Sequence, residues 1–298
     1  VTGKKFSKPA MSRVINGDVE LFETPKAPPK TRLDHILVQK HPEFNRSTLQ
    51  HFIKNGYVTV DGVITQKPNT LIEPGQIVIL TPPTIEKTEY HPDIIYEDNH
   101  VIVLNKPTGL LSMAKGEYCP EPTLEDFGLL VHRLDRDTSG VVILAKDSAT
   151  QKMLRRQFQD RKTHKTYYAV VEGHPKLPEA LIDLPIERNL KKPNTFLVGP
   201  NGKASQTYYK VIKQNNRYSL LELKPTTGRT HQLRVHLSHL GVPILGDRVY
   251  NSHVTEASNS RLFLHAFSLE ITIPSDDGPN LRRTFTAPLP PEFDDVLR

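Results

Sequence analysis

The sequence contains very little sulfur and no tryptophan. Its 298 residues include one cysteine, Cys119, and three methionines. A lone cysteine forms no intrachain disulfide and cannot build a cysteine metal cluster, which excludes a disulfide-stabilised secreted scaffold. We interpret Cys119 as a free thiol in a reducing compartment.

Long apolar runs are also missing. No stretch approaches the ~18 apolar residues that a membrane-spanning helix needs, and the chain does not open on a signal-peptide pattern. We therefore expect a cytoplasmic protein that is not inserted in a membrane. With 37% hydrophobic residues, a chain of this length can bury a sizeable core without disulfides or metal, and its length favours about two domains.

Acidic residues are slightly outnumbered by basic ones. Thirty-nine lysines and arginines oppose 33 aspartates and glutamates, which gives a formal charge of +6 and a pI near 9.2. A modest excess of this kind permits nucleic-acid binding but does not require it.

Composition divides the chain into four segments. Residues 1–30 carry few apolar side chains and end in a proline-rich stretch, which predicts a flexible arm. Residues 31–80 predict a small α/β domain, and residues 81–92 read as a linker with prolines and charges. Residues 93–298 form the larger domain.

The small domain shows helix and strand signals in alternation. A short helix is expected over 31–37 with Thr31 as its cap, and a second over 47–56 with Ser47 as its cap and Gly56 as its stop. Strands are expected at 57–63 and 76–80.

The larger domain is rich in strand signals. They fall at 94–97, 100–104, 141–145, 167–171 and 219–223, and helices are expected near 148–161 and 230–240. Many short strands with few helices predict an α+β fold with a mainly antiparallel mixed sheet and flanking helices.

Residues 132–140 are polar and run directly into an apolar strand signal. Asp135 lies in this stretch between Arg133 and Arg136. Charged groups beside a buried strand are costly unless they are paired or used. Asp135 is therefore either the anchor of a turn or an oriented carboxylate available as a nucleophile or base.

A second unusual segment spans residues 224–236. Gly228 allows a sharp turn from a strand to a helix, which places Arg229 at the helix start, where the helix dipole disfavours a cation. Arg229 is therefore a candidate for meeting an anion. A third segment begins at Lys165, and alternation puts Tyr167 and Tyr168 on opposite faces of a strand, so one tyrosine can face a cleft.

Together these segments resemble the RluA-type pseudouridine synthases over nearly all of residues 93–298. The family's motifs occur in the family's order. They are Lys106 to Leu110, His132 to Gly140, Lys165 to Tyr167, Thr227 to His236, Pro243 to Asp247 and Arg261 to Ala266. Six ordered motifs, two of them long, make a specific match.

Residues 31–80 similarly resemble an S4 RNA-binding domain. The resemblance rests on Arg32 to Asp34, Arg46 with Ser47, Ile53 to Val58, Val60 to Gly62 and Pro74 with Gly75. It implies that Arg32, Arg46, Ser47 and Lys54 contact RNA backbone.

The resemblance to the synthases implies isomerisation of uridine to pseudouridine in RNA, with no cofactor and no metal. Asp135 would act as nucleophile or base at the ribose of a flipped uridine. Arg229 would pair with Asp135, and Tyr167 would stack on the uracil and accept a proton from its C5 atom. Arg133 could fill the space that the flipped base leaves.

One segment departs from the family pattern. The stretch from Leu110 to Val131 is shorter than in typical members, and Pro120 and Pro122 interrupt it. A helix expected there should be reduced or missing, which bears on the wall that faces the substrate.

Other functions remain open at this point. A metal hydrolase could use His231, His236, His239 and Asp247, although the five-residue step from His231 to His236 does not fit the four-residue spacing of zinc-binding helices. A ribosome assembly factor without catalysis could also carry an S4 domain. The same chemistry could act on tRNA, although the S4 domain favours large-subunit ribosomal RNA. We expect a monomer.

Overall fold

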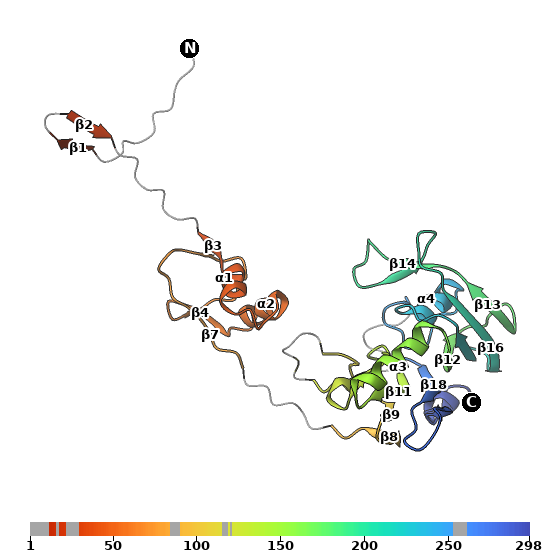
Figure 1. The fold of residues 1–298 in the computed structure, drawn as a ribbon. Helices are drawn as coiled ribbons and strands as arrows, with labels where there is room; N and C mark the ends of the chain where they lie inside the picture. The colour runs from red at the N-terminus through yellow and green to blue at the C-terminus, as the bar shows by residue number, and fades with distance from the viewer. Residues whose placement is uncertain are drawn as a thin grey trace, which may run out of the picture. The chain divides into compact units, whose positions relative to one another are not determined.

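The computed structural model describes residues 12–15, 18–21, 30–83, 90–114, 119, 121–252 and 261–298 (Figure 1). Two compact units result, one from the described residues up to 83 and one from those that follow. In the predicted arm, β1 (Ser12–Ile15) and β2 (Asp18–Leu21) pair as an antiparallel hairpin, which the composition did not predict. Most of the remaining arm, and part of the predicted linker, lie outside the described residues.

The small unit combines two helices with short strands. Its elements are β3 (Thr31–Arg32), α1 (Leu33–Lys40), α2 (Arg46–Lys54), β4 (Val58–Val60), β5 (Val63–Ile64), β6 (Leu71–Ile72) and β7 (Val78–Leu80). The strands form a sheet of order β5-β4-β7 and a separate β3–β6 pair. The apolar faces of the helices close a core of Leu33, Leu37, Leu49, Phe52, Ile53, Val58 and Ile72.

Both predicted helix caps of this unit are wrong. Thr31 belongs to β3, and α1 begins at Leu33. The cap of α2 is Asn45, whose side chain accepts a hydrogen bond from the Thr48 backbone N–H at 3.0 Å. Asn45 reaches the third residue of the helix, as a capping side chain must, so Ser47 lies inside the first turn.

The second unit is built on a ten-stranded sheet. Its main path runs β13 (Glu179–Asp183), β16 (Gln206–Gln214), β17 (Tyr218–Pro225), β12 (His164–Glu172), β18 (Leu264–Ile273), β11 (Ser139–Ala145), β9 (Val101–Lys106) and β8 (Asp93–Glu97). β10 (Leu129–Leu130) pairs with β11, and β19 (Leu281–Thr286) pairs with β18. Among the described strands of this sheet, only β11 and β18 pair in parallel. The mainly antiparallel mixed sheet of an α+β fold is thus confirmed.

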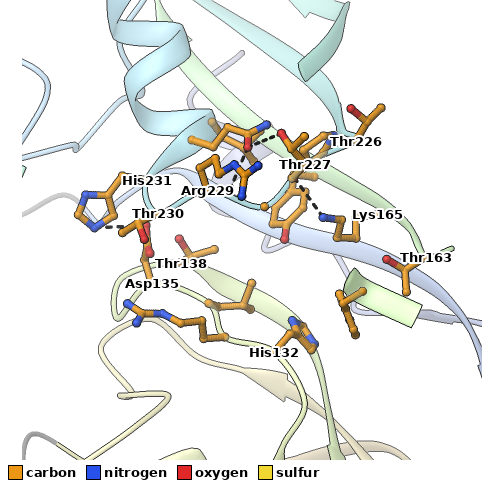
Figure 2. Close-up of a pocket in the computed structure, with 18 of the residues that line it drawn as sticks. His132, Asp135, Thr138, Thr163, Lys165, Thr226, Thr227, Arg229, Thr230 and His231 are labelled. Carbon is orange, nitrogen blue, oxygen red and sulfur yellow. Dashed lines mark hydrogen bonds and ion pairs between the residues drawn. The ribbon is translucent and has the colours of Figure 1, made fainter. Parts of the chain in front are cut away.

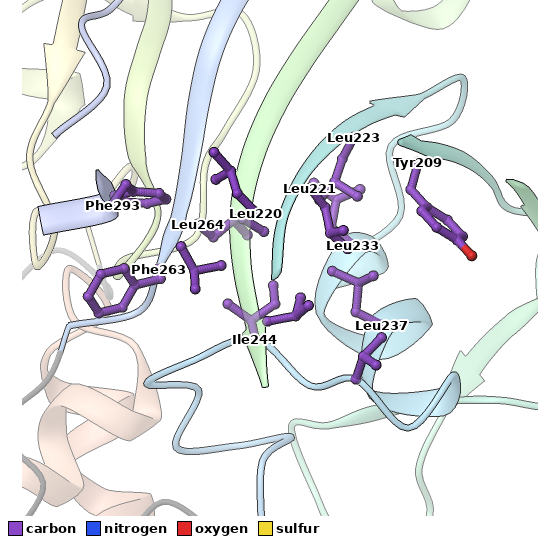
Figure 3. Close-up of a cluster of buried hydrophobic side chains, with 14 of the residues drawn as sticks. Tyr209, Leu220, Leu221, Leu223, Leu233, Leu237, Ile244, Phe263, Leu264 and Phe293 are labelled. Atoms are coloured by element: carbon purple, nitrogen blue, oxygen red, sulfur yellow. The ribbon is translucent and has the colours of Figure 1, made fainter. Parts of the chain in front are cut away.

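Few helices accompany this sheet. They are α3 (Ser148–Gln159), α4 (Gln232–His239) and α5 (Glu292–Asp295), and a small pair of strands, β14 (Ile186–Arg188) and β15 (Phe196–Val198), lies apart from the main sheet. Leu233 and Leu237 of α4 belong to the same buried cluster as Leu221 and Leu223 of β17 (Figure 3). This packing fixes the start of α4 beside the ends of β16 and β17. None of the described helices is long and apolar enough to cross a membrane.

The segment before the aspartate motif, 110–131, contains little helix in its described part. Within its described residues, the helical content is a single 3₁₀ turn, η1 (Leu124–Asp126), followed by β10. Thr123 and Asp126 form a reciprocal capping box around that turn.

The parallel pair β11–β18 brings two backbones unusually close. Gly140 has φ +114°, and a Cβ atom at this position would lie 2.2 Å from the carbonyl oxygen of Ala266. Only glycine fits there, so this residue sets the junction from which the polar loop 132–138 emerges.

Candidate active site

A buried lysine, Lys106, holds the backbone of the loop that carries Asp135. Lys106 Nζ donates hydrogen bonds to the carbonyl oxygens of Pro107, Arg136 and Thr138 at 2.9, 2.7 and 2.8 Å. Burial lowers the pKa of Lys106 to about 7, although the charges of Asp137 and Asp135 act in the opposite direction. Three carbonyl acceptors around one ammonium join the backbone that directly follows Asp135 to the segment at Pro107.

His132 is a structural member of the same loop. Its Nε2 accepts a hydrogen bond from the Ile143 backbone N–H at 3.2 Å, and its ring stacks on Phe158 with centroids 4.6 Å apart. Burial and the nearby Lys165 lower the pKa of His132 to about 3. The imidazole is therefore neutral and fastens the loop to β11 and α3.

A cavity of about 470 Å³ opens above this loop. Its walls come from the loop, from the end of α3, from β12 and from the segment that leads into α4 (Figure 2). The lining residues include Arg133, Asp135, Thr138, Gln159, Arg161, Lys165, Tyr167, Thr227, Arg229, His231 and Arg234. Motif residues that lie far apart in the sequence thus line one cavity, and Asp135 and Tyr167 are among them.

Asp135 faces the start of α4. Its Oδ2 lies 3.6 Å from Nη1 of Arg234 and 3.9 Å from Nε2 of His231, and its side chain is 20% exposed. Arg234 is itself fixed, because Nε and Nη2 each donate to the buried carboxylate of Asp247 at 2.7 Å. Burial raises the pKa of Asp247, but these two bonds outweigh it and the net shift is downward. Arg234 therefore holds a structural carboxylate with one edge and presents the other to Asp135.

The expected pair between Arg229 and Asp135 is not formed. Arg229 lines the same cavity, but its Nε donates to the Ala204 carbonyl at 3.3 Å. The pattern misplaced the cation by five residues, because α4 begins at Gln232 rather than near Thr230. Arg234, in the first turn of the helix, takes the position that was assigned to Arg229.

A buried glutamine shapes the turn between these arginines. Gln232 Oε1 accepts from Thr227 Oγ1 at 2.7 Å and from the Arg229 backbone N–H at 3.0 Å. Its Nε2 donates to the Gln206 carbonyl and to Thr207 Oγ1. All of its bonding capacity is used to join the turn to β16, so Gln232 is a positioning residue that the sequence did not reveal.

His231 adopts an uncommon backbone conformation at the edge of the cavity. Its φ is +57°, in the left-handed region that non-glycine residues rarely enter, and its Nδ1 lies 2.7 Å from the Tyr250 hydroxyl. Burial lowers the pKa of His231, while the Asp135 charge acts against that shift. The Tyr250 contact holds the ring so that Nε2 faces Asp135 (Figure 2).

Tyr167 reaches the cavity from the middle of the sheet. On β12 it stands opposite Leu223 of β17 and Ala266 of β18. Burial raises the pKa of Tyr167, and the Asp135 charge raises it further. The side chain is therefore a neutral phenol, suited to packing against a flat ring.

Lys165 is a lining residue to which the sequence assigned no role of its own. It lies two positions before Tyr167 on β12 and lines the same cavity, and its Nζ donates to the Thr227 carbonyl at 3.3 Å. Burial lowers the pKa of Lys165 to about 8. The period-two spacing from Tyr167 was the signal that could have identified it.

The histidines considered for a metal site do not converge. His236 donates from Nε2 to the Leu184 carbonyl at 3.0 Å, which leaves Nδ1 to accept from Thr207 Oγ1 at 3.0 Å. Asp247 is occupied by Arg234. The described residues contain no group of three or more histidine, cysteine or acidic side chains that could hold a metal ion.

In the small unit, two of the predicted RNA contacts serve another carboxylate. Asp34 is fully buried and accepts from Arg32 Nε at 3.0 Å, from Arg46 Nη2 at 2.8 Å and from Gln50 Nε2 at 2.9 Å. Both arginines are half exposed, so Arg32 joins β3 and Arg46 joins α2 to Asp34 while each guanidinium still presents an edge to solvent. Ser47 and Lys54 are exposed on α2.

Comparison with known proteins agrees with this site. The family model for RNA pseudouridylate synthase matches residues 100–239, and the S4 domain model matches residues 31–78. The chain is 36% identical to an uncharacterized RNA pseudouridine synthase of Chloroflexus aurantiacus, over 95% of this chain and 96% of that one. It is 31% identical to the ribosomal large subunit pseudouridine synthase C of Vibrio vulnificus, over 90% and 92%.

A solved structure shares the architecture of the larger unit. Human RNA pseudouridylate synthase domain containing 1 superposes with a TM-score of 0.58 at 29% identity, over 72% of this chain and 90% of that chain. The protein is thus an isomerase that acts on RNA. It belongs to the RNA pseudouridine synthase family and carries an S4 domain before the catalytic domain.

Proposed function

We propose that this enzyme isomerises uridine in large-subunit ribosomal RNA, in the cytoplasm, and that Asp135 is its catalytic residue. The observation that carries the catalytic assignment is the placement of Asp135 on the floor of the 470 Å³ cavity, beside Arg234 and across from Tyr167. The names of relatives such as the ribosomal large subunit pseudouridine synthases C and D support the choice of RNA.

The chemistry is an internal rearrangement. The N1–C1′ glycosidic bond breaks, the uracil rotates, and a C5–C1′ bond forms; N1 gains a proton and C5 loses one, so composition and charge are conserved. Asp135 reaches the ribose of a uridine that has left its stack, and it acts there as nucleophile at C1′ or as base. Arg234 orients the carboxylate through either route, because its own position is fixed by Asp247.

Tyr167 packs on the uracil and limits its rotation. The Tyr167 phenol is neutral, so it can accept the C5 proton only if it donates its own proton to another group. Asp135 is the carboxylate close enough for its charge to raise the pKa of Tyr167, and it can accept that proton. Arg229 and Lys165 line the same cavity and supply positive charge for the RNA backbone. Arg133, on the exposed rim, is available to occupy the space left in the RNA stack.

An Asp135→Asn variant tests the catalytic assignment. It should fold with an unchanged thermal midpoint and form no pseudouridine in unmodified ribosomal RNA, as read by chemical mapping. Turnover by this variant would contradict the proposal. Complete absence of pseudouridine with the wild type would instead favour a ribosome assembly factor.

Mapping of pseudouridines in cells that lack the gene tests the RNA. We expect a missing site in large-subunit ribosomal RNA that returns when the gene is restored. Loss confined to tRNA would move the substrate to that class while leaving the chemistry intact.

Removal of residues 1–80 tests the role of the S4 domain. The truncated protein should bind structured ribosomal RNA more weakly and with a flatter dependence on salt, since fewer phosphate contacts release fewer counterions. It should still act on short stem-loops. Unchanged affinity would argue against RNA binding by this domain.

A further inference from the structure

A second cavity lies beside the catalytic one. It has a volume of about 320 Å³ and shares His132 and Arg133 with the first. Its other lining residues are Met113, Glu125, Gly128, Leu129, Leu130, Val131, Gln151 and Arg155. Ligand pockets begin at roughly this size.

One face of α3 runs along both cavities. Gln151 and Arg155 line the second cavity, while Phe158 and Gln159 line the first. Arg155 follows Gln151 by four residues, and Phe158 and Gln159 follow Arg155 by three and four, so these side chains lie on the same side of the helix. From Gln151 to Gln159 the helix rises by about 12 Å, so the two cavities lie next to each other along α3.

The second cavity combines cationic and apolar groups. Arg155 donates its Nε to the Leu130 carbonyl at 3.1 Å, which fixes the guanidinium plane, and no described residue accepts a hydrogen bond from its terminal nitrogens. Arg133 is exposed and makes no hydrogen bond or ion pair with any part of the chain that the structure describes. Met113 and Leu129 line the same space and are 49% and 38% exposed.

These groups match an unstacked nucleotide. Flat bases pack on apolar side chains and on guanidinium planes, and phosphates bind arginine. When a uridine turns out into the catalytic cavity, the nucleotide next to it loses a stacking partner, and a receptive surface nearby offsets that loss.

We propose that the second cavity binds a nucleotide that flanks the target uridine, with Met113, Leu129 and the guanidinium plane of Arg155 against its base. This inference rests on the proposed function, because it needs single-stranded RNA to enter the first cavity. Glu125 sets a preference within the subsite. Its Oε2 accepts from the Ala114 backbone N–H at 2.9 Å, which leaves Oε1 for an exocyclic amino group, so adenine, cytosine or guanine is favoured over uracil.

The test uses a stem-loop that contains a mapped target uridine, with an abasic nucleotide placed at each flanking position in turn. For the wild type, one flanking position should raise KM about tenfold, the range that base stacking supplies, while kcat stays the same. Arg155→Ala should raise KM for the intact RNA by a similar factor. In that variant the abasic substitution should have no further effect, because the two changes remove one interaction.

Arg156→Ala is the matched control. Arg156 lies on the same helix, is 81% exposed and lines neither cavity, so both KM and the abasic penalty should remain as in the wild type. Arg155→Lys should show an intermediate KM, since it keeps the charge and loses the planar fork. Two outcomes would overturn the subsite. One is a KM for the abasic RNA with Arg155→Ala that equals the product of the two separate increases; the other is a wild-type KM that does not change at any abasic position.

Direct binding separates this proposal from the catalytic one. Fluorescence anisotropy of the same labelled RNAs with Asp135→Asn needs no turnover and should give the same position-dependent loss of affinity. If the wild type formed no pseudouridine and this pattern persisted, the catalytic assignment alone would fail.

Discussion

Arg234 binds two carboxylates of different kinds at the same time. Nε and Nη2 grip the buried Asp247 at 2.7 Å each, and Nη1 lies 3.6 Å from the partly exposed Asp135. The pair with Asp247 is buried and held by two hydrogen bonds, whereas the pair with Asp135 lies in the cavity, where substrate can reach it. The position of the Asp135 carboxylate therefore depends on the ion pair between Arg234 and Asp247.

Replacement of Arg234 by lysine should distinguish the role of Arg234 from that of Arg229. Arg234→Lys loses the fork that spans Asp247 and Asp135, so we expect kcat to fall about 100-fold, the cost of a small misplacement of a reacting group. The free energy of unfolding should fall by about 1–3 kcal/mol. Single-turnover pseudouridine formation and urea titration measure the two effects. Arg229→Lys serves as the control, with kcat unchanged and only KM raised, and the reverse order of effects would contradict this reading of the site.

The buried lysine of the cavity predicts an alkaline limit on RNA binding. Burial lowers the pKa of Lys165 to about 8, so its cation is present below pH 8 and is lost as the pH rises through that value. We expect kcat/KM to decline above pH 8, and the decline should disappear in Lys165→Arg, whose charge persists. A pH profile of kcat/KM in both proteins checks this. An identical alkaline limb in Lys165→Arg would assign the titration to another group, such as Lys106.

The close approach at Gly140 predicts a large cost for one methyl group. Gly140→Ala places Cβ 2.2 Å from the Ala266 carbonyl oxygen at φ +114°, so the β11–β18 junction must move, and we expect a loss of at least about 3 kcal/mol of unfolding free energy. Gly173→Ala is the control, with φ +79° and no atom within 4 Å of the added Cβ. It should cost about 1–2 kcal/mol from backbone conformation alone. Equal losses in the two variants would show that the contact with Ala266 has no energetic weight.

The carboxylate buried in the small unit predicts sensitivity to acid. Burial favours a raised pKa for Asp34, but hydrogen bonds from Arg32, Arg46 and Gln50 outweigh it and hold the pKa well below its ordinary value. Its stabilising effect is therefore complete above the unfolded pKa of about 3.9 and declines as the pH falls below that value. Methyl NMR signals of Leu37 and Leu49 in urea report on this unit. Asp34→Asn should be less stable at pH 7 by about 2–3 kcal/mol, and its difference from the wild type should shrink below pH 4. A difference that does not change with pH would contradict the mechanism.

Most of the fold and part of the site could be predicted from the sequence. Apolar strand signals located β8, β9, β11, β12 and β17 of the large sheet but not its other strands, and the motif around Asp135 pointed to a carboxylate that lines the cavity. The assignment of Arg229 failed because the start of α4 depends on a left-handed His231, which a tertiary contact with Tyr250 stabilises. A helix start two residues later changes which arginine lies beside Asp135.

The role of Asp34 was hidden for a related reason. In the sequence, Arg32 and Arg46 looked like surface cations beside an unremarkable acidic residue. Their convergence on one buried carboxylate depends on how α1 packs against α2, and that packing is set by the apolar core rather than by the charged residues.

The parallel pairing of β11 with β18 also sets the order in which the enzyme can become active. Residues 139 and 140 find their partners at 265 and 266, more than a hundred positions later, and β18 must slot between β11 and β12 before Asp135 and Tyr167 can face one cavity. Domains fold as units while a chain leaves the ribosome. The small RNA-binding unit can therefore form early in synthesis. The cavity that Asp135 and Tyr167 share cannot form until β18 has been made, so a nascent chain has an RNA-binding unit before it has this cavity.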